Sequence, residues 1–184
     1  MKHVLIVTGA AGSGKTTVSG YLNETYHIPR VITHTTRKPR DGEVNGVDYY
    51  FETRESMDRL HLLEQVEYDH NLYGSSYEGL EKAWAHSELA TIVLDTKGAQ
   101  TYRKTLGEKA VVLFLTVTKR HSLVRRLAQR GDLKTAVKQR IASAEYHRDL
   151  TLPDQLSDIA NVIVNDDWEK TKMELDKLVK SLEH

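Results

Sequence analysis

A glycine-rich turn near the start of the chain constrains the fold more than any other feature. Residues 9–16 read Gly-Ala-Ala-Gly-Ser-Gly-Lys-Thr, which fits the pattern GxxxxGK[ST], and they follow the apolar, β-branched run of residues 3–8. This pattern binds phosphate only where a strand turns into a helix, and residues 18–26 carry apolar side chains at helical spacing. The order of strand, turn and helix therefore predicts a phosphate-binding loop in an α/β fold.

The chemistry of this loop rests on backbone N–H groups and two side chains. Glycines allow consecutive N–H groups to face inward and cradle phosphate oxygens, and the positive end of the next helix adds about half a unit charge. We expect Lys15 to reach the β- and γ-phosphates of a nucleoside triphosphate and the Thr16 hydroxyl to bind Mg²⁺. The expected cofactor is therefore Mg²⁺ bound together with the triphosphate.

The composition excludes several classes of partner and site. Lys and Arg number 26, as do Asp and Glu, so no global basic field favours nucleic acid as a partner. There are no cysteines, which excludes disulfides and thiolate metal sites. No apolar run approaches the ~18 residues of a membrane-spanning helix, and no signal-peptide pattern precedes the first strand. We therefore expect a single cytoplasmic domain that has no membrane contact.

Strand-like and helix-like patterns alternate along much of the chain. Apolar runs at residues 30–33, 90–95, 110–116 and 161–164 are typical of buried strands, and helical patterns lie between them. This alternation predicts a parallel sheet flanked by helices.

Residues 34–88 interrupt the alternation, because they are richer in turn and polar signals than a simple crossover helix. Within them, Ser75-x-x-Glu78 has the form of a capping box and predicts the start of a helix. We expect a small lobe at about 34–88, inserted into a core of residues 1–33 and 89–184. A lobe beside a phosphate loop is a natural place for a second substrate.

Arg37 and Arg40 lie three residues apart in a segment interrupted by Pro39. A planar guanidinium binds phosphate oxygens in bidentate fashion, which lysine does less well. The pair therefore favours a phosphate group on the second substrate.

Arg130 and Arg140 flank Gly131 within a helical hairpin at about 125–147. Arginines that close over a transferring phosphoryl group accelerate the transfer by ~10³–10⁵. The alternative is a solvated, charged helix face. We interpret the hairpin as a closing lid, because the glycine supplies a hinge.

Four segments resemble the guanylate kinases. Residues 33–51 read THTTRKPRDGEVNGVDYYF, which resembles the GMP-binding signature of that family, and NLYGS at 71–75, RLAQRG at 126–131 and VIVNDD at 162–167 match it in the same order. The resemblance spans nearly the whole chain. It implies a P-loop three-layer α/β sandwich with a parallel core sheet, a small inserted GMP-binding lobe and a helical lid. It also implies Mg²⁺-dependent phosphoryl transfer from ATP to GMP, which gives ADP and GDP.

The resemblance further implies a set of site residues. The GMP phosphate is expected to contact Arg37, Arg40, Tyr49 and Tyr73, whose guanidinium and phenol groups offer a dianion many charge-assisted donors. The expected catalytic groups are Lys15, Arg37, Arg40, Arg130 and Arg140. The expected ATP contacts are Gly9, Ala10, Ala11, Gly12, Ser13, Gly14, Lys15, Thr16, Thr17, Arg126 and Asn165. For Asn165 a second interpretation stays open, in which it caps the last helix.

Guanine recognition in the family implies Thr33, Ser75 and a glutamate that aligns to Glu67, with Glu64 as its rival. The alignment is open because the chain between residues 51 and 73 is several residues shorter than is typical. A carboxylate accepts from both N1–H and the 2-amino group of guanine, which adenine does not offer. Asp95 is expected to contact GMP or a metal-bound water.

ATP and GMP are thus the expected partners, of a monomer or weak homodimer. Two rival functions remain. One is another small-molecule kinase on the same scaffold, which is expected to lack the signature around Arg37 and Tyr49. The other is a non-catalytic guanylate-kinase-like module that binds proteins, although such modules have degraded phosphate loops and Lys15 and Thr16 are intact here.

Overall fold

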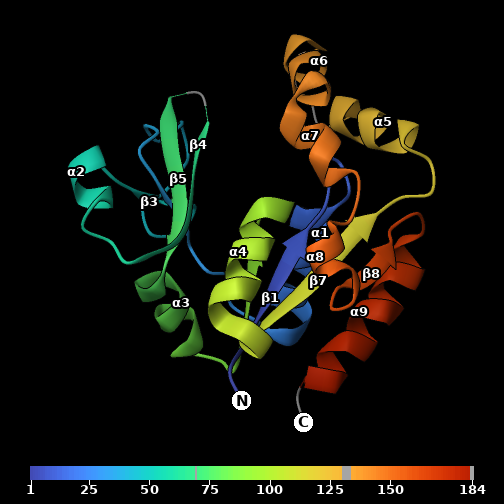
Figure 1. The fold of residues 1–184 in the computed structure, drawn as a ribbon, viewed down its shortest axis with the longest axis horizontal. Helices are drawn as coiled ribbons and strands as arrows, with labels where there is room; N and C mark the ends of the chain where they lie inside the picture. The colour runs from blue at the N-terminus through green and yellow to red at the C-terminus, as the bar shows by residue number, and fades with distance from the viewer. Residues whose placement is uncertain (69, 130–133, 183–184) are drawn as a thin grey trace.

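Two four-stranded sheets organise the chain in the computed structural model, which describes residues 1–68, 70–129 and 134–182 (Figure 1). The strands are β1 (His3–Thr8), β2 (His34–Thr35), β3 (Tyr50–Phe51), β4 (Leu62–Tyr68), β5 (Asn71–Ser76), β6 (Leu89–Val93), β7 (Ala110–Thr116) and β8 (Asn161–Val164). The helices are α1 (Lys15–Tyr26), α2 (Arg54–Met57), α3 (Tyr77–Trp84), α4 (Thr96–Leu106), α5 (His121–Gln129), α6 (Lys134–Ala142), α7 (Ala144–Asp149), α8 (Asp154–Ser157) and α9 (Trp168–Leu182).

The core sheet has the order β6-β1-β7-β8, and every pair in it is parallel. The inner strand β1 is covered by helices on both faces of the sheet, which explains why its sequence is a continuous apolar run. Val4 and Ile6 pack in one apolar cluster with residues of α3 and α4, and Leu5 and Val7 pack in another with residues of α1 and α9. Helices on both faces of a parallel sheet confirm the expected three-layer α/β architecture.

Two of the predicted core strands, 110–116 and 161–164, are confirmed at their bounds as β7 and β8, and the third, 90–95, is observed as β6. The strand predicted at residues 30–33 is wrong. It is reduced to a single bridge between Arg30 and Thr91, supported by the Val31 N–H, which donates to the Thr91 carbonyl over 2.8 Å. The chain then leaves the core sheet, because His34 and Thr35 pair with Gly74 and Tyr73 in the second sheet.

The second sheet has the order β3-β2-β5-β4. It is mixed, since β2 pairs with β3 in parallel but β5 pairs antiparallel with both β2 and β4. This sheet and α3 fall within residues 34–88, the range expected for an inserted lobe; the domain boundaries themselves stay a prediction.

Helix α3 begins one residue later than its capping pattern suggested. The cap is Ser76, whose Oγ accepts from the Gly79 N–H over 3.0 Å. Ser75 instead pairs with Glu64 of β4, so its hydroxyl is used within the second sheet.

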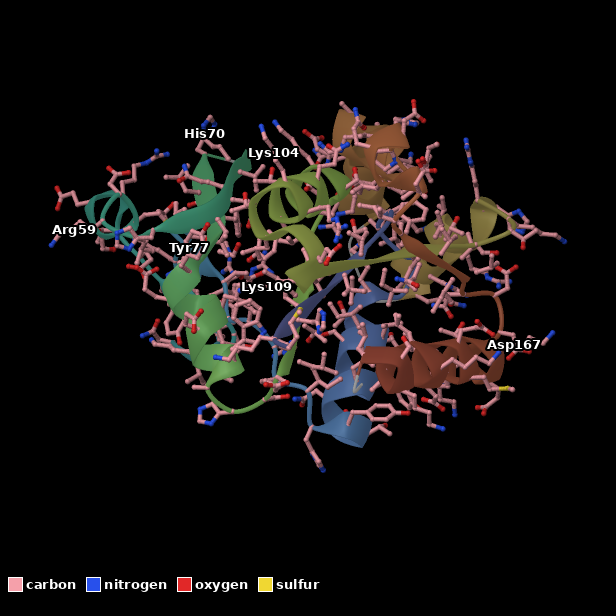
Figure 2. The ribbon with its side chains drawn as sticks, turned by 60° about the horizontal axis from the view of Figure 1, so that its bottom comes forward. Arg59, His70, Tyr77, Lys104, Lys109 and Asp167 are labelled. Carbon is pink, nitrogen blue, oxygen red and sulfur yellow. The ribbon has the colours of Figure 1, made fainter. Side chains whose placement is uncertain are left out.

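Helices α5, α6 and α7 stand beyond the carboxyl ends of β1 and β7 (Figure 1). Charged side chains are distributed around the molecule, as Arg59, Lys104 and Asp167 illustrate in Figure 2. Within the described ranges, none of the helices combines the length and apolar character that crossing a bilayer requires.

Candidate functional site

The phosphate loop connects β1 to α1, and its shape depends on glycine. Gly9 and Gly12 have φ angles of 132° and 86°, a left-handed region that favours glycine. A Cβ on Gly9 would lie 2.2 Å from the Leu115 carbonyl oxygen, and one on Gly12 would lie 2.6 Å from the Leu123 carbonyl oxygen. The loop is therefore pressed against the backbone of β7 and α5, which fixes the direction of its N–H groups.

Lys15 is the first residue of α1 and lies over this loop. Its Nζ donates to the carbonyl oxygens of Gly9 at 2.7 Å and Ala10 at 3.0 Å. The N-cap of α1 is Gly14, which brings no capping side chain, and the first turn carries no acidic residue. A helix start of this kind presents its N–H groups and positive dipole to an anion.

Asn165, directly after β8, and Arg126 of α5 hold the loop in place through hydrogen bonds. The amide nitrogen Nδ2 of Asn165 donates to the Ser13 carbonyl oxygen at 2.8 Å, and its Oδ1 accepts from the Thr171 hydroxyl at 2.9 Å. The Nη2 of Arg126 donates to the Asn165 carbonyl oxygen at 2.7 Å. Asp167 caps α9 by accepting from the N–H groups of Glu169 and Lys170, so the capping role considered for Asn165 is wrong. The expected contact of Asn165 with ATP stays a prediction.

Two cavities meet at Lys15 and Arg140. The first is about 500 Å³ and is lined by the residues Ala11, Gly12, Gly14, Lys15, Thr16, Thr17, Arg126, Gln129 and Arg140. The second is about 330 Å³, and its lining includes Lys15, Tyr73, Asp95 and Arg140. The structure therefore brings the phosphate loop, the second sheet and helix α6, which is part of the predicted lid, to one continuous site. Arg130 lies outside the described residues.

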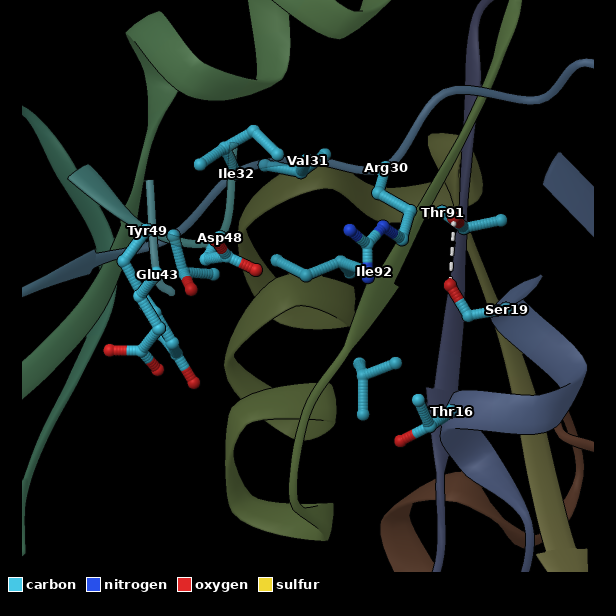
Figure 3. Close-up of a pocket in the computed structure, with 12 residues that line it drawn as sticks. Thr16, Ser19, Arg30, Val31, Ile32, Glu43, Asp48, Tyr49, Thr91 and Ile92 are labelled. Carbon is cyan, nitrogen blue, oxygen red and sulfur yellow. Dashed lines mark hydrogen bonds between the residues drawn. The ribbon is translucent and has the colours of Figure 1, made fainter. Parts of the chain in front are cut away.

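A third cavity, of about 320 Å³, extends from α1 toward the segment before β3 (Figure 3). Thr16 of α1 lies on one side, and Glu43 and Tyr49 lie on the other, with the Arg30 guanidinium between them. Thr33 also lines this cavity. Thr16 lines the first cavity as well, so the two spaces adjoin at this residue.

Arg37, Tyr49 and Tyr73 form a cluster on the second sheet. The Arg37 guanidinium lies 5.5 Å from the centre of the Tyr49 ring, and the Tyr49 and Tyr73 ring centres are 6.3 Å apart. Glu43 holds the arginine in bidentate fashion, because Arg37 Nη2 donates to its Oε1 at 2.8 Å and Nη1 to its Oε2 at 3.0 Å. The arginine lowers the pKa of Glu43 to about 2, so the pair is ionised at neutral pH. Arg40 is exposed nearby, and its backbone N–H donates to Glu43 Oε2 at 2.7 Å.

Glu67, the residue that the sequence alignment favoured for guanine recognition, lies away from the face that carries Ser75. The register of β4 and β5 pairs Glu64 with Ser75 but Glu67 with Leu72. Since side chains alternate along a strand, Glu64 and Glu67 point to opposite faces of the sheet. Glu67 is half-exposed and lies 3.9 Å from Arg54, whereas Glu64 Oε1 accepts from the Ser75 hydroxyl at 3.0 Å. The face that carries Ser75 therefore presents Glu64, the rival in the sequence alignment.

The Glu64 carboxyl has a strongly raised pKa. Burial raises its pKa to about 7, and the charge of Asp95 contributes to the rise. Val66 and Tyr73, the next pair on the same face, both line the second cavity. Glu64, Ser75 and Tyr73 thus form one row that faces the core.

Asp95 lies at the start of α4, in contact with a residue that sequence reasoning missed. Its Oδ1 accepts from the Gly98 N–H at 2.6 Å, and its Oδ2 accepts from Arg148 Nη2 at 2.8 Å. The Nε of Arg148 donates to Asp149 Oδ1 at 2.9 Å, and this carboxylate also accepts from the Thr96 hydroxyl at 2.6 Å. These contacts tie α7 to α4, and no motif around Arg148 pointed to them.

Comparisons with known proteins agree with this geometry. A family model described as guanylate kinase matches residues 1–182. Among curated proteins, the guanylate kinase of Lactobacillus delbrueckii subsp. bulgaricus is 38% identical over 148 residues, covering 77% of this chain and 72% of that protein. The guanylate kinase of Neisseria gonorrhoeae is 34% identical over 179 residues, covering 94% and 84% respectively.

Among solved structures, the crystal structure of guanylate kinase from Anaplasma phagocytophilum superposes with a TM-score of 0.67 at 25% identity. The match covers 98% of this chain and 85% of that one. A full-length family match, curated relatives across most of the chain and a shared fold that carries an intact phosphate loop lead to one conclusion: this chain belongs to the guanylate kinase family.

Proposed function

We propose that the chain transfers the γ-phosphoryl group of ATP to GMP, giving ADP and GDP. One observation carries this proposal. Lys15 and Arg140 line both the cavity at the phosphate loop and the cavity that holds Tyr73 and Asp95. A triphosphate bound on the loop would therefore point its last phosphate at a second anion on the Tyr73 side, with two cations beside the transferring group.

The phosphate loop binds the triphosphate of ATP in this proposal. Its N–H groups and the start of α1 hold the phosphate oxygens, and Lys15 moves from the loop carbonyls to the β- and γ-phosphates. Asn165 supports the loop through its hydrogen bond to Ser13, and Arg126, which lines the same cavity, holds Asn165. Residues at about 125–147 act as the lid, with Arg140 and Arg130 as its cations.

GMP binds on the second sheet, the inserted lobe at about 34–88. Arg37, Tyr49 and Tyr73 hold its phosphate, and Arg40 joins them by turning its exposed side chain inward. The phosphate of GMP has to compete with the Glu43 carboxylate for Arg37, and a dianion with more acceptor oxygens is suited to win that competition.

Guanine is recognised by Glu64, rather than Glu67, together with Ser75 and Thr33. Glu64 and Ser75 are opposite each other on the face that looks toward the core, which supports this assignment. The carboxylate accepts from N1–H and the 2-amino group of guanine, and adenine would leave it without those donors at a cost of about 1–3 kcal/mol.

Mg²⁺ fits the donors of this site as an ion carried by the substrate. Among the described residues, no group of three or more acidic or histidine side chains is placed to hold a metal ion. Mg²⁺ is commonly bound by one or two protein oxygens together with phosphate oxygens and water, and the exposed Thr16 hydroxyl offers such an oxygen. When bound, the ion would neutralise charge on the β- and γ-phosphates.

The reaction needs no general base, because the acceptor phosphate of GMP is already anionic. The protein contributes positioning and charge neutralisation. Lys15 and Arg140 face the transferring group, and closure of the lobe at about 34–88 and the lid at about 125–147 excludes water.

ATP and GMP are the proposed small-molecule partners of this chain. We propose that the chain is a monomer or a weak homodimer, and sedimentation analysis tests this oligomeric state.

The direct test supplies ATP and Mg²⁺ and measures the rate of ADP release with each of five acceptors: GMP, dGMP, AMP, CMP and UMP. We expect kcat/KM for GMP to exceed that for AMP by roughly 100-fold or more. Equal use of AMP would indicate a small-molecule kinase of other specificity. No turnover of any nucleotide would indicate a binding module, and either result would overturn the proposal.

A further inference from the structure

Tyr102 connects the core to the proposed guanine site. It lies on α4, which Figure 1 shows between the second sheet and β1, and its side chain is fully buried in the core cluster of Val4 and Ile6. Its phenol O–H donates to Ser75 Oγ at 2.7 Å. The Ser75 hydroxyl in turn donates to Glu64 Oε1 at 3.0 Å. Three buried or half-buried groups therefore form one chain of hydrogen bonds from the core to the base-reading carboxylate.

The direction of this chain is set by the number of protons available. Burial raises the pKa of Tyr102, so the phenol keeps its proton and acts as the donor. A serine hydroxyl has a single proton, and Ser75 Oγ already accepts from Tyr102. Ser75 can then offer its own proton to Glu64, which favours the carboxylate form of Glu64 as the acceptor.

We propose that Tyr102 is a positioning residue for base selection, which directs the Ser75 proton toward Glu64 and so presents Glu64 to guanine as an acceptor. This inference rests on the proposed function. Without the phenol, Ser75 no longer receives the hydrogen bond that polarises its own O–H, and it donates more weakly to the Glu64 carboxylate. The protonated form of Glu64 is then favoured relative to the carboxylate, and it presents guanine with one acceptor fewer.

The charges around Glu64 make this balance important near neutral pH. Its carboxyl faces Asp95 and Tyr102 of α4 and Ser75 of β5. Burial raises the pKa of Glu64 to about 7, Asp95 contributes to the rise, and the Ser75 hydrogen bond opposes it. Arg148 is bound to Asp95 and offsets part of that negative charge. Because the pKa of this carboxyl is raised toward neutral pH, loss of one directed hydrogen bond shifts its balance toward the protonated form.

The test compares wild-type protein with Tyr102→Phe between about pH 6 and 9, a range that spans the titration of Glu64. We expect KM for GMP to rise about tenfold near neutral pH, with kcat and KM for ATP changed by less than about twofold. The defect should shrink at the alkaline end, because Glu64 ionises there without help. The acid limb of kcat/KM for GMP should accordingly move to higher pH. The ionisation of the GMP phosphate at about pH 6 is common to all variants and does not move.

Tyr21→Phe is the matched control. Tyr21 also donates a 2.7 Å hydrogen bond, to Asp176. This bond joins α1 to α9, away from the proposed base site. This variant should leave KM for GMP and the pH profile unchanged. A Tyr102→Phe defect that is equal at every pH, or that lowers kcat and KM for ATP together, would mean that the residue acts only through packing and would overturn the inference.

A double-mutant cycle with Ser75→Ala tests the order of the chain. Since the phenol acts through Ser75, Tyr102→Phe should add little to KM for GMP in the Ser75→Ala background; additive effects would contradict the relay. Titration of Glu64 by carbon NMR gives a readout independent of turnover, and its pKa should rise in Tyr102→Phe. Absence of GMP turnover by the wild-type protein would overturn the proposed function itself. Normal wild-type turnover with an unaltered Tyr102→Phe would overturn only this inference.

Discussion

The phosphate loop and the second sheet build their anion sites in different ways. The loop is made of backbone, and Gly9 and Gly12 press it against carbonyl groups of β7 and α5. The proposed site on the second sheet is made of side chains: Arg37 lies just after β2, Tyr49 just before β3, and Tyr73 on β5. There, Arg37 is positioned by the Glu43 carboxylate rather than by the main chain.

The two proposed sites are therefore prepared for their ligands to different degrees. The direction of the loop N–H groups is set by the fold and needs no change to hold a phosphate. The arginine and tyrosine cluster has to exchange Glu43 for a ligand before it can bind one. We therefore expect changes in the loop to affect chemistry and folding, and changes in the cluster to affect recognition of one nucleotide.

The largest effect should come from Lys15→Ala. It removes one of the two cations that line both cavities, so we expect kcat to fall by about 10³ while KM for GMP changes little. Single-turnover and steady-state rates with ATP and GMP provide the measurement. Lys104→Ala, on the exposed side of α4, is the control and should retain wild-type rates. A Lys15→Ala enzyme with near-normal kcat would contradict the role of the loop.

Gly9→Ala tests whether the loop is a backbone structure. The added Cβ meets the Leu115 carbonyl oxygen at 2.2 Å, at a φ of 132°, so we expect the free energy of unfolding to fall by roughly 3 kcal/mol. Gly20→Ala is the matched control, because its Cβ meets nothing within 4 Å in the middle of α1, and it should stabilise the protein by about 0.5–1 kcal/mol. Urea unfolding measures both. Equal effects would mean that the loop tolerates a side chain.

Glu64→Gln and Glu67→Gln compare the two faces of β4. Loss of the carboxylate at Glu64 should lower kcat/KM for GMP about 50-fold and relax discrimination against AMP, because the amide presents one acceptor in place of two. The exposed Glu67 should change this ratio by less than about twofold. Competition assays with GMP and AMP measure it. The reverse ranking would show that the strand register does not decide guanine recognition.

Tyr49→Phe should give the smallest effect. Removing one phenol donor from the cluster is expected to raise KM for GMP about tenfold with kcat unchanged. Tyr77→Phe, an exposed tyrosine on α3, serves as the control. An unaltered KM for GMP in Tyr49→Phe would remove this residue from the phosphate site.

The sequence predicted what is local, and the structure supplied what depends on pairing. The phosphate loop, β7 and β8 are contiguous patterns, and each was found where it was predicted. The strand predicted at 30–33 fails because the chain leaves the core sheet after one bridge, between Arg30 and Thr91, and His34 and Thr35 pair in the second sheet instead.

In the candidate site, too, the features that depend on pairing between distant segments could not be predicted from local patterns. The choice between Glu64 and Glu67 depends on the β4–β5 register, which includes an irregularity between Leu62 and Glu64 that no count along the sequence reveals. The signal that could have found Glu64 is strand pairing, because Glu64 is the residue opposite Ser75. The contact of Arg148 with Asp95 joins residues 53 positions apart, beyond the reach of any local pattern.

Calorimetric titration of GMP alone and of ATP with Mg²⁺ alone, into wild-type protein and Glu64→Gln, tests the central claim most directly. If the backbone loop and the second sheet bind different nucleotides, the variant should lose affinity for GMP by about 50-fold and keep its affinity for ATP. Equal losses for the two nucleotides, or no loss for either, would contradict the division of the site.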